Sequence, residues 1–312
     1  MRVVFFGTPR FSVPSLAALI DAGFDVPLVV TQPDRPVGRS ARPRPSAVAE
    51  LAAERGLSIE RPEKLRGNAP FFDRLVASRP EAIAVVAYGK LLPTEILDLP
   101  PQGCVNVHAS LLPRHRGASP IPATILAGDS ETGVVTMRIV PELDAGPLYL
   151  ERRAAVGPRE NAASLSERLA REGAELLVDT LRGLEQGSLT ARPQVGEPTL
   201  TRPIRREDAR VNWSEPATAI DRRLRAFTPW PGLYAILGGE RVKLLELEPA
   251  GRIISARQPG MIWEELGEPM VVAGDGTAVL LKMVQRAGRR PVTGAEFLRG
   301  IPFRPVRFEP AS

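Results

Sequence analysis

The strongest constraint on the fold is an alternation that runs through the first half of the chain. Apolar runs of strand length alternate there with amphipathic stretches of helical period. This pattern is typical of a parallel sheet covered by helices, because such strands are buried on both faces. We expect strands at 2–6, 26–30, 82–87 and 103–108. The expected helices are one that carries Leu16, Leu19 and Ile20 on one face and is ended by Gly23, and one at 46–55. We therefore predict an α/β fold with a Rossmann-like, mostly parallel sheet flanked by helices.

The last third of the chain shows a different pattern. Residues 186–206 are rich in proline, glycine and threonine and have little apolar periodicity, which is typical of a linker. An amphipathic helix is expected at about 216–226, and the short β-like runs after it indicate a small antiparallel barrel. The predicted segments are a catalytic domain over 1–189, a linker over 190–205, and an OB-like β-barrel domain over 206–312.

Composition excludes several classes of protein. One cysteine cannot form an internal disulfide, and one cysteine with two histidines cannot build a cysteine-rich zinc site, so we expect no metal. No stretch approaches the roughly 18 apolar residues of a membrane span. The first residues lack the pattern of a signal peptide, so we expect a cytoplasmic protein with no membrane partner. A net charge of +5 permits an anionic partner, but almost all basic residues are arginine, and the base composition of the genome explains that equally well.

Both histidines lie in one stretch, GCVNVHASLLPRHRG at 103–117. Within the strand predicted there, Asn106 and His108 are two residues apart, so their side chains share a face. They stand at the C-terminal end of the strand, which is the edge where open α/β sheets bind ligands. A carboxamide beside an imidazole N–H is a donor pair suited to an oxyanion. The structural alternative is that Asn106 caps a turn and His108 is a buried, satisfied histidine.

A third polar residue, Asp144, lies in the glycine-flanked loop PELDAGP after the strand-like run TMRIV. An aspartate there is usually a turn residue, but a carboxylate near a histidine can orient it, raise its pKa and relay protons. The three residues predict attack on a carbonyl group whose developing O⁻ is held by Asn106 and His108. Ser110 has no second histidine as its base, and we place Cys104 on the opposite face of the strand. The nucleophile is therefore expected to belong to a substrate.

Several motifs connect the chain with a known family. They are NVHASLLPRHRG at 106–117, TQPDRPVGR at 31–39, VVAYGKLLP at 85–93 and FTPWPG at 227–232, together with the Asp144 loop. With them the chain resembles the methionyl-tRNA formyltransferases over almost its whole length. The Asn, His and Asp set belongs to the wider group of 10-formyltetrahydrofolate-dependent transferases, whereas the 31–39 loop and the C-terminal domain narrow the resemblance to the tRNA enzymes.

The resemblance implies transfer of a formyl group from 10-formyltetrahydrofolate to the α-amino group of methionine on initiator tRNA, in support of translation initiation. It implies that Asn106 and His108 polarise the formyl oxygen. It also implies that Asp144 assists loss of the amine proton, through a proton transfer that involves water. The residues implied at the folate pocket are Tyr88, Gly89, Ser110, Leu111, Leu112 and Pro113.

Two positions depart from the family pattern. His115 stands where relatives have Tyr or Trp, and we interpret it as a loop residue. The run Thr201 to Ile204 (TRPI) replaces Tyr-Ala-x-Lys-Ile, so a tRNA contact of that lysine is not carried over.

The segment between the second strand and the second helix is long and basic. It spans about fifteen residues where such connections usually have roughly 2–6, and between Asp34 and Arg44 it holds four arginines against one aspartate. Arginines meet phosphates bidentately, so Arg35, Arg39 and Arg42 are the predicted tRNA-binding residues, and the resemblance implies that Arg39 lies near the acceptor end. The alternative is a solvated surface loop. From residue 205 onward, 17 Lys and Arg against 13 Asp and Glu favour a second electrostatic surface for tRNA.

Three other classes of protein fit the sequence less well. A nucleotide-dependent dehydrogenase would need G-x-G-x-x-G after the first strand, where the chain has GTPRFS at 7–12. A non-enzymatic RNA-binding protein would leave Asn106, His108 and Asp144 without a role. A folate-dependent transferase for a small amine, such as an amino sugar or a glycinamide nucleotide, is the nearest alternative. We expect the protein to act as a monomer.

Overall fold

The computed structural model describes residues 1–36, 43–251, 258–301 and 306–310. Contacts divide the described chain into two units. The first unit comprises 1–120, 130–155 and 165–201, and the second comprises 121–129, 156–164 and the residues from 202 onward. Arg39 and Arg42 lie outside the described residues.

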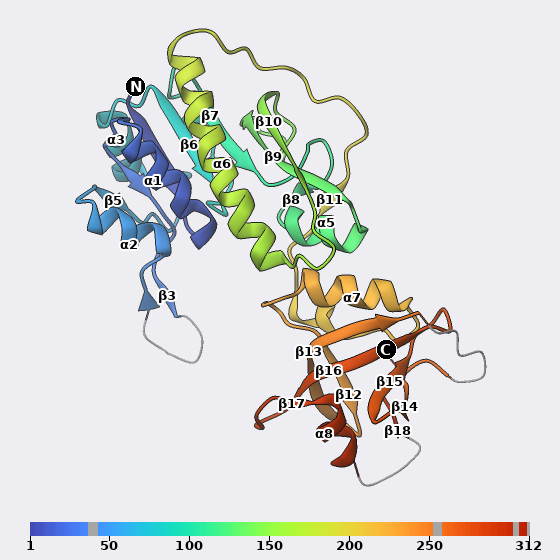
Figure 1. Cartoon of the computed structure of the whole chain (residues 1–312). Coiled ribbons are helices and arrows are strands. Elements are labelled where there is room, and N and C mark those ends of the chain that lie inside the picture. Colours follow the sequence, from blue (N-terminus) through green and yellow to red (C-terminus); the bar gives the residue numbers. More distant parts are fainter. Residues whose placement is uncertain (37–42, 252–257, 302–305, 311–312) are drawn as a thin grey trace. The chain divides into compact units, whose positions relative to one another are not determined.

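A seven-stranded sheet in the order β10-β9-β7-β6-β1-β2-β5 forms the centre of the first unit (Figure 1). Its strands are β1 Val3–Gly7, β2 Val29–Val30, β5 Ile59–Glu60, β6 Ala82–Val86, β7 Cys104–His108, β9 Glu131–Arg138 and β10 Leu148–Ala155. The first five of these are mutually parallel, whereas β9 runs antiparallel to β7 and to β10. Two small ribbons accompany the sheet: β3 Arg35–Pro36 with β4 Pro43–Arg44, and β8 Arg116–Gly117 with β11 Leu200–Thr201.

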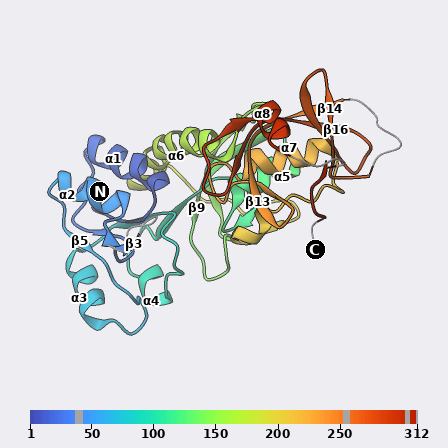
Figure 2. The same ribbon diagram turned by 90° about the horizontal axis from the view of Figure 1, so that it is seen from below.

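Helices cover both faces of this sheet, as the alternation of the sequence predicts. The helices that lie wholly or mainly in this unit are α1 Val13–Asp21, α2 Ala47–Glu54, α3 Ala69–Ala77, α4 Thr94–Leu97 and α6 Ala162–Glu185, with the 3-10 turn η1 Arg10–Ser12. One apolar cluster joins α1, α2 and α6 to the face that carries Val105 and Val107. The other joins α3 and α4 to the face that carries Cys104. Figure 2 shows α3 and α4 on the opposite side of the sheet from α1.

Strand parity therefore decides where the polar residues of β7 project. Residues 104, 106 and 108 share a face, and Cys104 packs into the α3 and α4 cluster. The expectation that Cys104 lies on the face opposite to Asn106 and His108 was wrong, because positions two apart on a strand point the same way.

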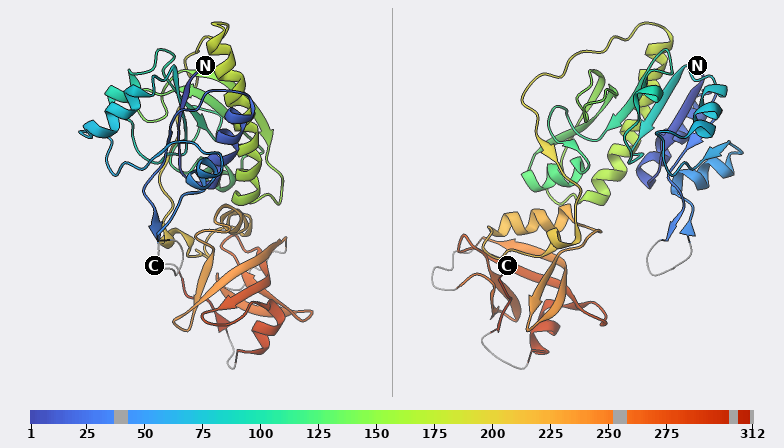
Figure 3. Two further views of the ribbon diagram at one scale, coloured as in Figure 1. Left: turned by 90° about the vertical axis from the view of Figure 1, so that its left-hand side faces the viewer. Right: turned by 180° about the vertical axis from the view of Figure 1, so that it is seen from behind.

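The second unit is built around an antiparallel sheet in the order β12-β13-β16-β15-β14-β18, with β17 added to β16. Its elements are α5 Pro120–Ala127, η2 Arg206–Ala209, α7 Ala217–Ala226, β12 Tyr234–Leu237, β13 Glu240–Ala250, β14 Met261–Glu265, β15 Glu268–Val272, β16 Ala278–Arg286, β17 Val292–Thr293, α8 Gly294–Arg299 and β18 Val306–Arg307. The amide of Glu309 donates to the carbonyl of Ile236 at 2.8 Å, which brings the two ends of the sheet together. The strands curl into a nearly closed barrel (Figure 3).

These elements confirm the predicted fold class, a mostly parallel α/β sheet followed by a small antiparallel barrel. The second strand is shorter than 26–30, since only Val29 and Val30 pair with both neighbours. The boundaries 1–189, 190–205 and 206–312 stay a prediction. None of the helices within the described ranges is long and apolar enough to cross a membrane.

Candidate active site and arginine-rich surfaces

The C-terminal ends of the parallel strands bring polar residues to one edge of the sheet. Thr8 follows β1, Gln32 follows β2, Tyr88 follows β6, and His108 ends β7. Thr8 and Gln32 both donate side-chain hydrogen bonds to the carbonyl of Tyr88, at 3.2 and 2.9 Å. The turn after β6 is thus fixed by the turns after β1 and β2, next to the strand that carries His108.

His108 is buried, with 6% of its surface exposed. Its Nε2 lies 3.1 Å from the carbonyl oxygen of His115, and its Nδ1 lies 3.7 Å from Oδ2 of Asp144. Burial lowers the pKa of His108 below its ordinary value of 6.5, while the nearby Asp144 carboxylate acts in the opposite direction. His108 is therefore neutral at pH 7.

Both neighbours of the His108 ring nitrogens are acceptor oxygens, and the shorter contact, from Nε2 to His115, favours one tautomer. A carbonyl oxygen only accepts hydrogen bonds, so Nε2 must carry the proton for the contact with His115 to be favourable. That tautomer leaves a lone pair on Nδ1, beside Asp144. A proton arriving at Nδ1 would turn the contact with Asp144 into an ion pair.

Asp144 reaches this position from a strand that runs against β7. Its backbone has φ +47°, a left-handed conformation that is uncommon outside glycine. Its Oδ2 accepts a hydrogen bond from the amide of Gly117 at 2.8 Å. About 17% of its side chain is exposed, compared with 7% for His108. Asp144 is therefore the more accessible member of the pair.

Asn106 lies on the same face of β7, one pleat before His108. It is half-buried, and its carboxamide makes no hydrogen bond to any residue that the structure describes. A carboxamide at the ligand edge without an internal partner is free to bind a ligand. The structure thus brings Asn106, His108 and Asp144 together as the sequence predicts, with roles that remain a prediction.

The residues predicted for the folate pocket occupy two kinds of position. Tyr88 is 2% exposed and packs edge-on against Phe6, and burial raises the pKa of Tyr88 to about 12. Ser110 is fully buried and its hydroxyl donates to the carbonyl of Arg114 at 2.6 Å.

The other four predicted pocket residues follow the same division between buried and accessible positions. Leu112 is buried in a small cluster to which Leu111 adds a half-buried side chain. Gly89 is exposed and Pro113 half-buried. Gly89 has φ +85°, and a Cβ there would lie 2.7 Å from the Gln32 amide, so this turn requires glycine. The groups that a ligand could reach are thus at Gly89, Leu111 and Pro113.

Neither possible protein nucleophile is available. Cys104 is 1% exposed, and burial raises the pKa of its thiol to about 12, so almost no thiolate is present at neutral pH. The Ser110 hydroxyl donates its proton to a carbonyl and has no base. Within the described residues no cluster of three His, Cys, Asp or Glu side chains could hold a metal ion.

Sequence reasoning missed three residues that hold this site together. His115, interpreted as a loop residue, supplies the carbonyl that binds His108, and its own amide donates to the Thr199 hydroxyl at 2.8 Å. Gln194 donates to the carbonyls of Asp144 and Gly146, each at 2.8 Å. These contacts join residues far apart in the chain through backbone groups, so the periodicity of the sequence does not predict them.

The ends of the basic loop form the β3–β4 ribbon, which places Arg35 directly opposite Arg44. Like charges paired across strands destabilise each other unless an anion lies between them. Arg35 also lies near Lys90, whose pKa is lowered by partial burial and then by the Arg35 charge. Of the predicted tRNA-binding residues, only Arg35 is described, and it is exposed. The base of the loop therefore concentrates positive charge.

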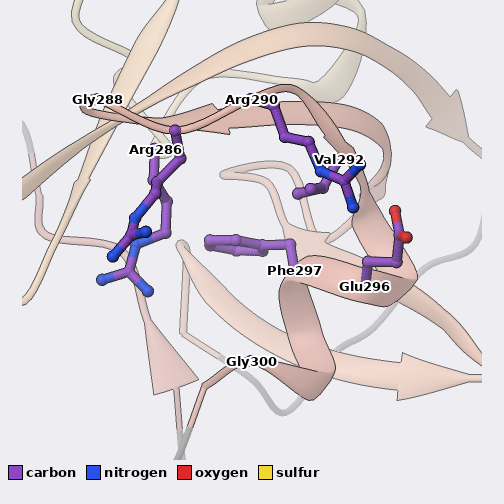
Figure 4. A pocket seen from close by; sticks show the side chains of 8 residues that line it. Arg286, Gly288, Arg290, Val292, Glu296, Phe297 and Gly300 are labelled. Atoms are coloured by element: carbon purple, nitrogen blue, oxygen red, sulfur yellow. The ribbon is translucent and has the colours of Figure 1, made fainter.

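A second cationic surface lies in the barrel, as a groove of about 510 Å³ between the β16–β17 turn and α8. It is lined by Arg286, Gly288, Arg289, Arg290, Val292, Glu296, Phe297 and Gly300. Figure 4 shows the Phe297 ring with Arg286 on one side and Arg290 on the other. Arg286 pairs with Glu240, whereas Arg289 and Arg290 have no ion pair within the described ranges. The groove thus holds two guanidinium groups outside the ion pairs of the described chain, with the Glu296 carboxylate beside the guanidinium of Arg290.

Comparison with known proteins adds the family context. Residues 1–181 match the model of the formyl transferase family, and residues 203–302 match the model of its C-terminal domain. The chain is 46% identical over 301 residues to the methionyl-tRNA formyltransferase of Thermus thermophilus, covering 96% of each chain. It is 41% identical over 314 residues to that of Aromatoleum aromaticum, covering 100% of this chain and 98% of the other.

Solved structures show the same fold at lower identity. A sugar 3N-formyl transferase, WlaRD, solved in the presence of dTDP and 5-N-formyl-THF, has a TM-score of 0.67 at 15% identity. The alignment covers 93% of this chain and 99% of that one. At this identity the likeness shows the fold alone.

Proposed function

The chain belongs to the methionyl-tRNA formyltransferases of the formyl transferase family, and on that premise we infer that it formylates the α-amino group of Met-tRNA from a formyl-tetrahydrofolate donor. The observation that carries the assignment of the site is the half-buried Asn106 carboxamide without an internal partner, beside the His108 and Asp144 pair at the ligand edge of the sheet. The small-amine alternative is disfavoured, because identities of 41–46% over nearly the full length, barrel included, are with tRNA enzymes.

The formyl donor fits the residues at this edge. When bound, 10-formyltetrahydrofolate supplies the carbonyl carbon that the amine attacks. The free donor atoms of Asn106 suit the oxygen of such a carbonyl, and the exposed turn at Gly89 with Leu111 and Pro113 gives the pterin ring a backbone and apolar edge to lie against. We propose that the reaction requires no metal, since every role is filled by these side chains.

Asn106 stabilises the charge that develops on the formyl oxygen. Its NH₂ group is already oriented by β7 and loses no internal hydrogen bond when it donates to the substrate. Such a fixed donor in a site of low dielectric is effective because it needs no reorganisation during the reaction.

The His108 and Asp144 pair receives the proton that the amine loses. The sequence predicts a second oxyanion donor at His108, but the bond from Nε2–H to His115 uses the only N–H of the neutral ring. Asp144 is the more exposed partner and takes the proton from the amine first, and because Oδ2 lies 3.7 Å from Nδ1, beyond hydrogen-bond distance, a water molecule carries the proton on to Nδ1. An α-amino group with a pKa of about 8 is partly neutral at pH 7, so this pair suffices as a base.

The two arginine-rich surfaces bind the tRNA backbone. Arg35 and the undescribed Arg39 and Arg42 act near the acceptor end, and Arg289 and Arg290 provide a contact in the barrel. We further propose that the tRNA is the initiator, that the enzyme acts as a monomer, and that it works in the cytoplasm alongside translation.

The proposed function is tested by incubating the protein with 10-formyltetrahydrofolate and Met-tRNA and measuring formyl-methionine by mass after hydrolysis of the ester bond. We expect a gain of one formyl group that depends on both substrates. Formylation of an amino sugar nucleotide in parallel reactions, with none of Met-tRNA, would contradict the proposal.

A further inference from the structure

The 192–201 segment lies along the first unit as a strap beside the candidate site. Leu148 and Arg192 exchange two backbone hydrogen bonds, at 2.7 and 2.8 Å. The amide of Arg116 donates to the carbonyl of Thr199 at 2.8 Å, and Leu200 and Thr201 pair in parallel with β8. The strap is thus anchored at both ends.

Two side chains of the strap bind the backbone on either side of His108. The Gln194 carboxamide is fully used: its Nε2 donates to the carbonyls of Asp144 and Gly146, and its Oε1 accepts from Arg116 at 3.1 and 2.6 Å. The Thr199 hydroxyl accepts from the amide of His115 at 2.8 Å.

The residues held in this way are both in unfavourable backbone conformations. Asp144 has φ +47° and His115 has φ +61°, and neither is glycine. Such conformations persist only when surrounding contacts fix them. Each of the two residues also contributes one of the two groups that contact His108, namely Oδ2 of Asp144 and the carbonyl of His115.

We propose that Gln194 and Thr199 are positioning residues that hold Asp144 and His115 in place on the two sides of His108. Without Gln194, the Asp144 loop is free to relax, and its carboxylate moves away from Nδ1. Without the Thr199 hydroxyl, the His115 peptide is free to rotate, and Nε2 loses its acceptor. This proposal rests on the catalytic roles of His108 and Asp144 given above.

The titration of His108 reports this positioning without any substrate. The ionisable groups facing His108 are Asp144, which raises its pKa, and His115, which lowers it. A displaced Asp144 therefore leaves the pKa of His108 lower than in the wild type. The chain has two histidines, and NMR of ¹⁵N-labelled protein distinguishes their rings with His115→Asn, since asparagine tolerates positive φ.

Gln194→Met removes the four hydrogen bonds while keeping the length and neutral charge of the side chain. Its matched control is Gln186→Met, since Gln186 is exposed and has no side-chain hydrogen bond among the described residues. Thr199→Val removes only the hydroxyl, and its matched control is the exposed Thr190→Val. Asp144→Asn serves as the reference for complete loss of the carboxylate.

We expect Gln194→Met to shift the His108 titration to lower pH, in the direction of Asp144→Asn, and to reduce kcat by roughly tenfold to a hundredfold, as misplacement by about 1 Å does. The KM for the folate donor and both controls stay at wild-type values. Thr199→Val, which keeps the strap intact, is expected to change the His108 titration as well, and it carries the test if Gln194→Met does not fold.

Two results separate the possible failures. A wild-type His108 titration and kcat in Gln194→Met and Thr199→Val, with a shifted titration in Asp144→Asn, would overturn the positioning role and leave the proposed function intact. A titration unchanged even in Asp144→Asn would show that the pair itself is not coupled, and the proposed function would lose its base.

Discussion

The candidate site and the arginine-rich surfaces differ in the burial and in the contacts of their charged groups. Around His108, charge is sparse and buried, and each contact comes from one specified atom, such as the His115 carbonyl or the Gly117 amide. On the β3–β4 ribbon and in the barrel groove, the cations are exposed, and Arg35 is paired with Arg44 across the ribbon. The difference indicates that the site depends on the positions of individual atoms, whereas the surfaces depend on the number of charges.

Asp144→Asn gives the largest expected loss on the geometric side of this comparison. The amide keeps an oxygen for the Gly117 N–H but cannot take a proton, and positioned acid–base groups contribute roughly 10²–10⁴ in rate. We expect kcat to fall by that factor with the KM for Met-tRNA unchanged. Asp73→Asn, at an exposed position of α3, is the control and keeps wild-type kcat. Equal kcat values for the two variants would remove Asp144 from the mechanism.

Substitution of Asn106 is expected to give the next largest loss of kcat, and two variants test its role. Asn106→Ala removes the donor and is expected to cost about 10²–10³ in kcat. Asn106→Asp keeps the shape but places a carboxylate against the developing O⁻, so it should be slower still. Single-turnover rates measure both. An aspartate variant faster than the alanine variant would show that Asn106 does not face the formyl oxygen.

On the other side of the comparison, Arg289→Ala with Arg290→Ala tests the groove. Each lost phosphate contact should weaken Met-tRNA binding and flatten the slope of log K against log salt by roughly 0.7–0.9. Donor affinity and kcat at saturating Met-tRNA should not change. Arg55→Ala with Arg153→Ala removes the same charge elsewhere and serves as the control. The groove has no part in tRNA binding if the two double variants have the same salt slope.

Arg39 and Arg42 of the basic loop belong to the same side of the comparison as the groove, since their predicted role depends on charge. Arg39→Ala with Arg42→Ala should likewise lower kcat/KM for Met-tRNA and flatten its salt slope, with folate affinity unaltered. The control is the affinity of the same variant for the folate donor, measured in the absence of tRNA. Wild-type kcat/KM and salt slope would assign tRNA binding to the barrel alone.

The smallest expected effect concerns stability. Because the pKa of His108 is lowered in the folded protein, the unfolded chain binds this proton more readily. Stability contributed by the neutral ring is present above pH 6.5 and is lost as the pH falls through the folded pKa, by at most about 1.4 kcal/mol per pH unit. The free energy of unfolding, measured by urea denaturation between about pH 5 and about pH 7, reports this dependence, because this range spans the ordinary histidine pKa. His108→Gln should show a weaker dependence than the wild type.

Much of this arrangement was predictable from the sequence because it repeats locally. Apolar runs predicted β1, β6 and β7, and the two-residue period put Asn106 and His108 on one face. The approach of Asp144 was predicted only as proximity to a histidine. Its strand runs antiparallel to β7, so the rule that parallel strands end at one edge does not explain its position.

The contacts that hold the site were not predictable in the same way. Gln194 and Thr199 lie in a stretch whose proline and glycine content indicated a linker, and their partners are backbone atoms about 50 to 84 positions away in the chain. A backbone carbonyl such as that of His115 has no sequence signal, because every residue carries one.

The most direct test of the account is the pH dependence of kcat/KM for Met-tRNA in the wild type and in His108→Gln. Glutamine can donate a hydrogen bond but cannot take a proton. We predict that log kcat/KM of the wild type falls with a slope of about one below pH 8, as the amine protonates, and about two below the lowered pKa of His108. His108→Gln should be roughly 10²–10⁴ slower at pH 7 and keep a slope of one throughout. A His108→Gln rate within a few-fold of wild type, with the same two slopes, would contradict the proton-accepting role of His108.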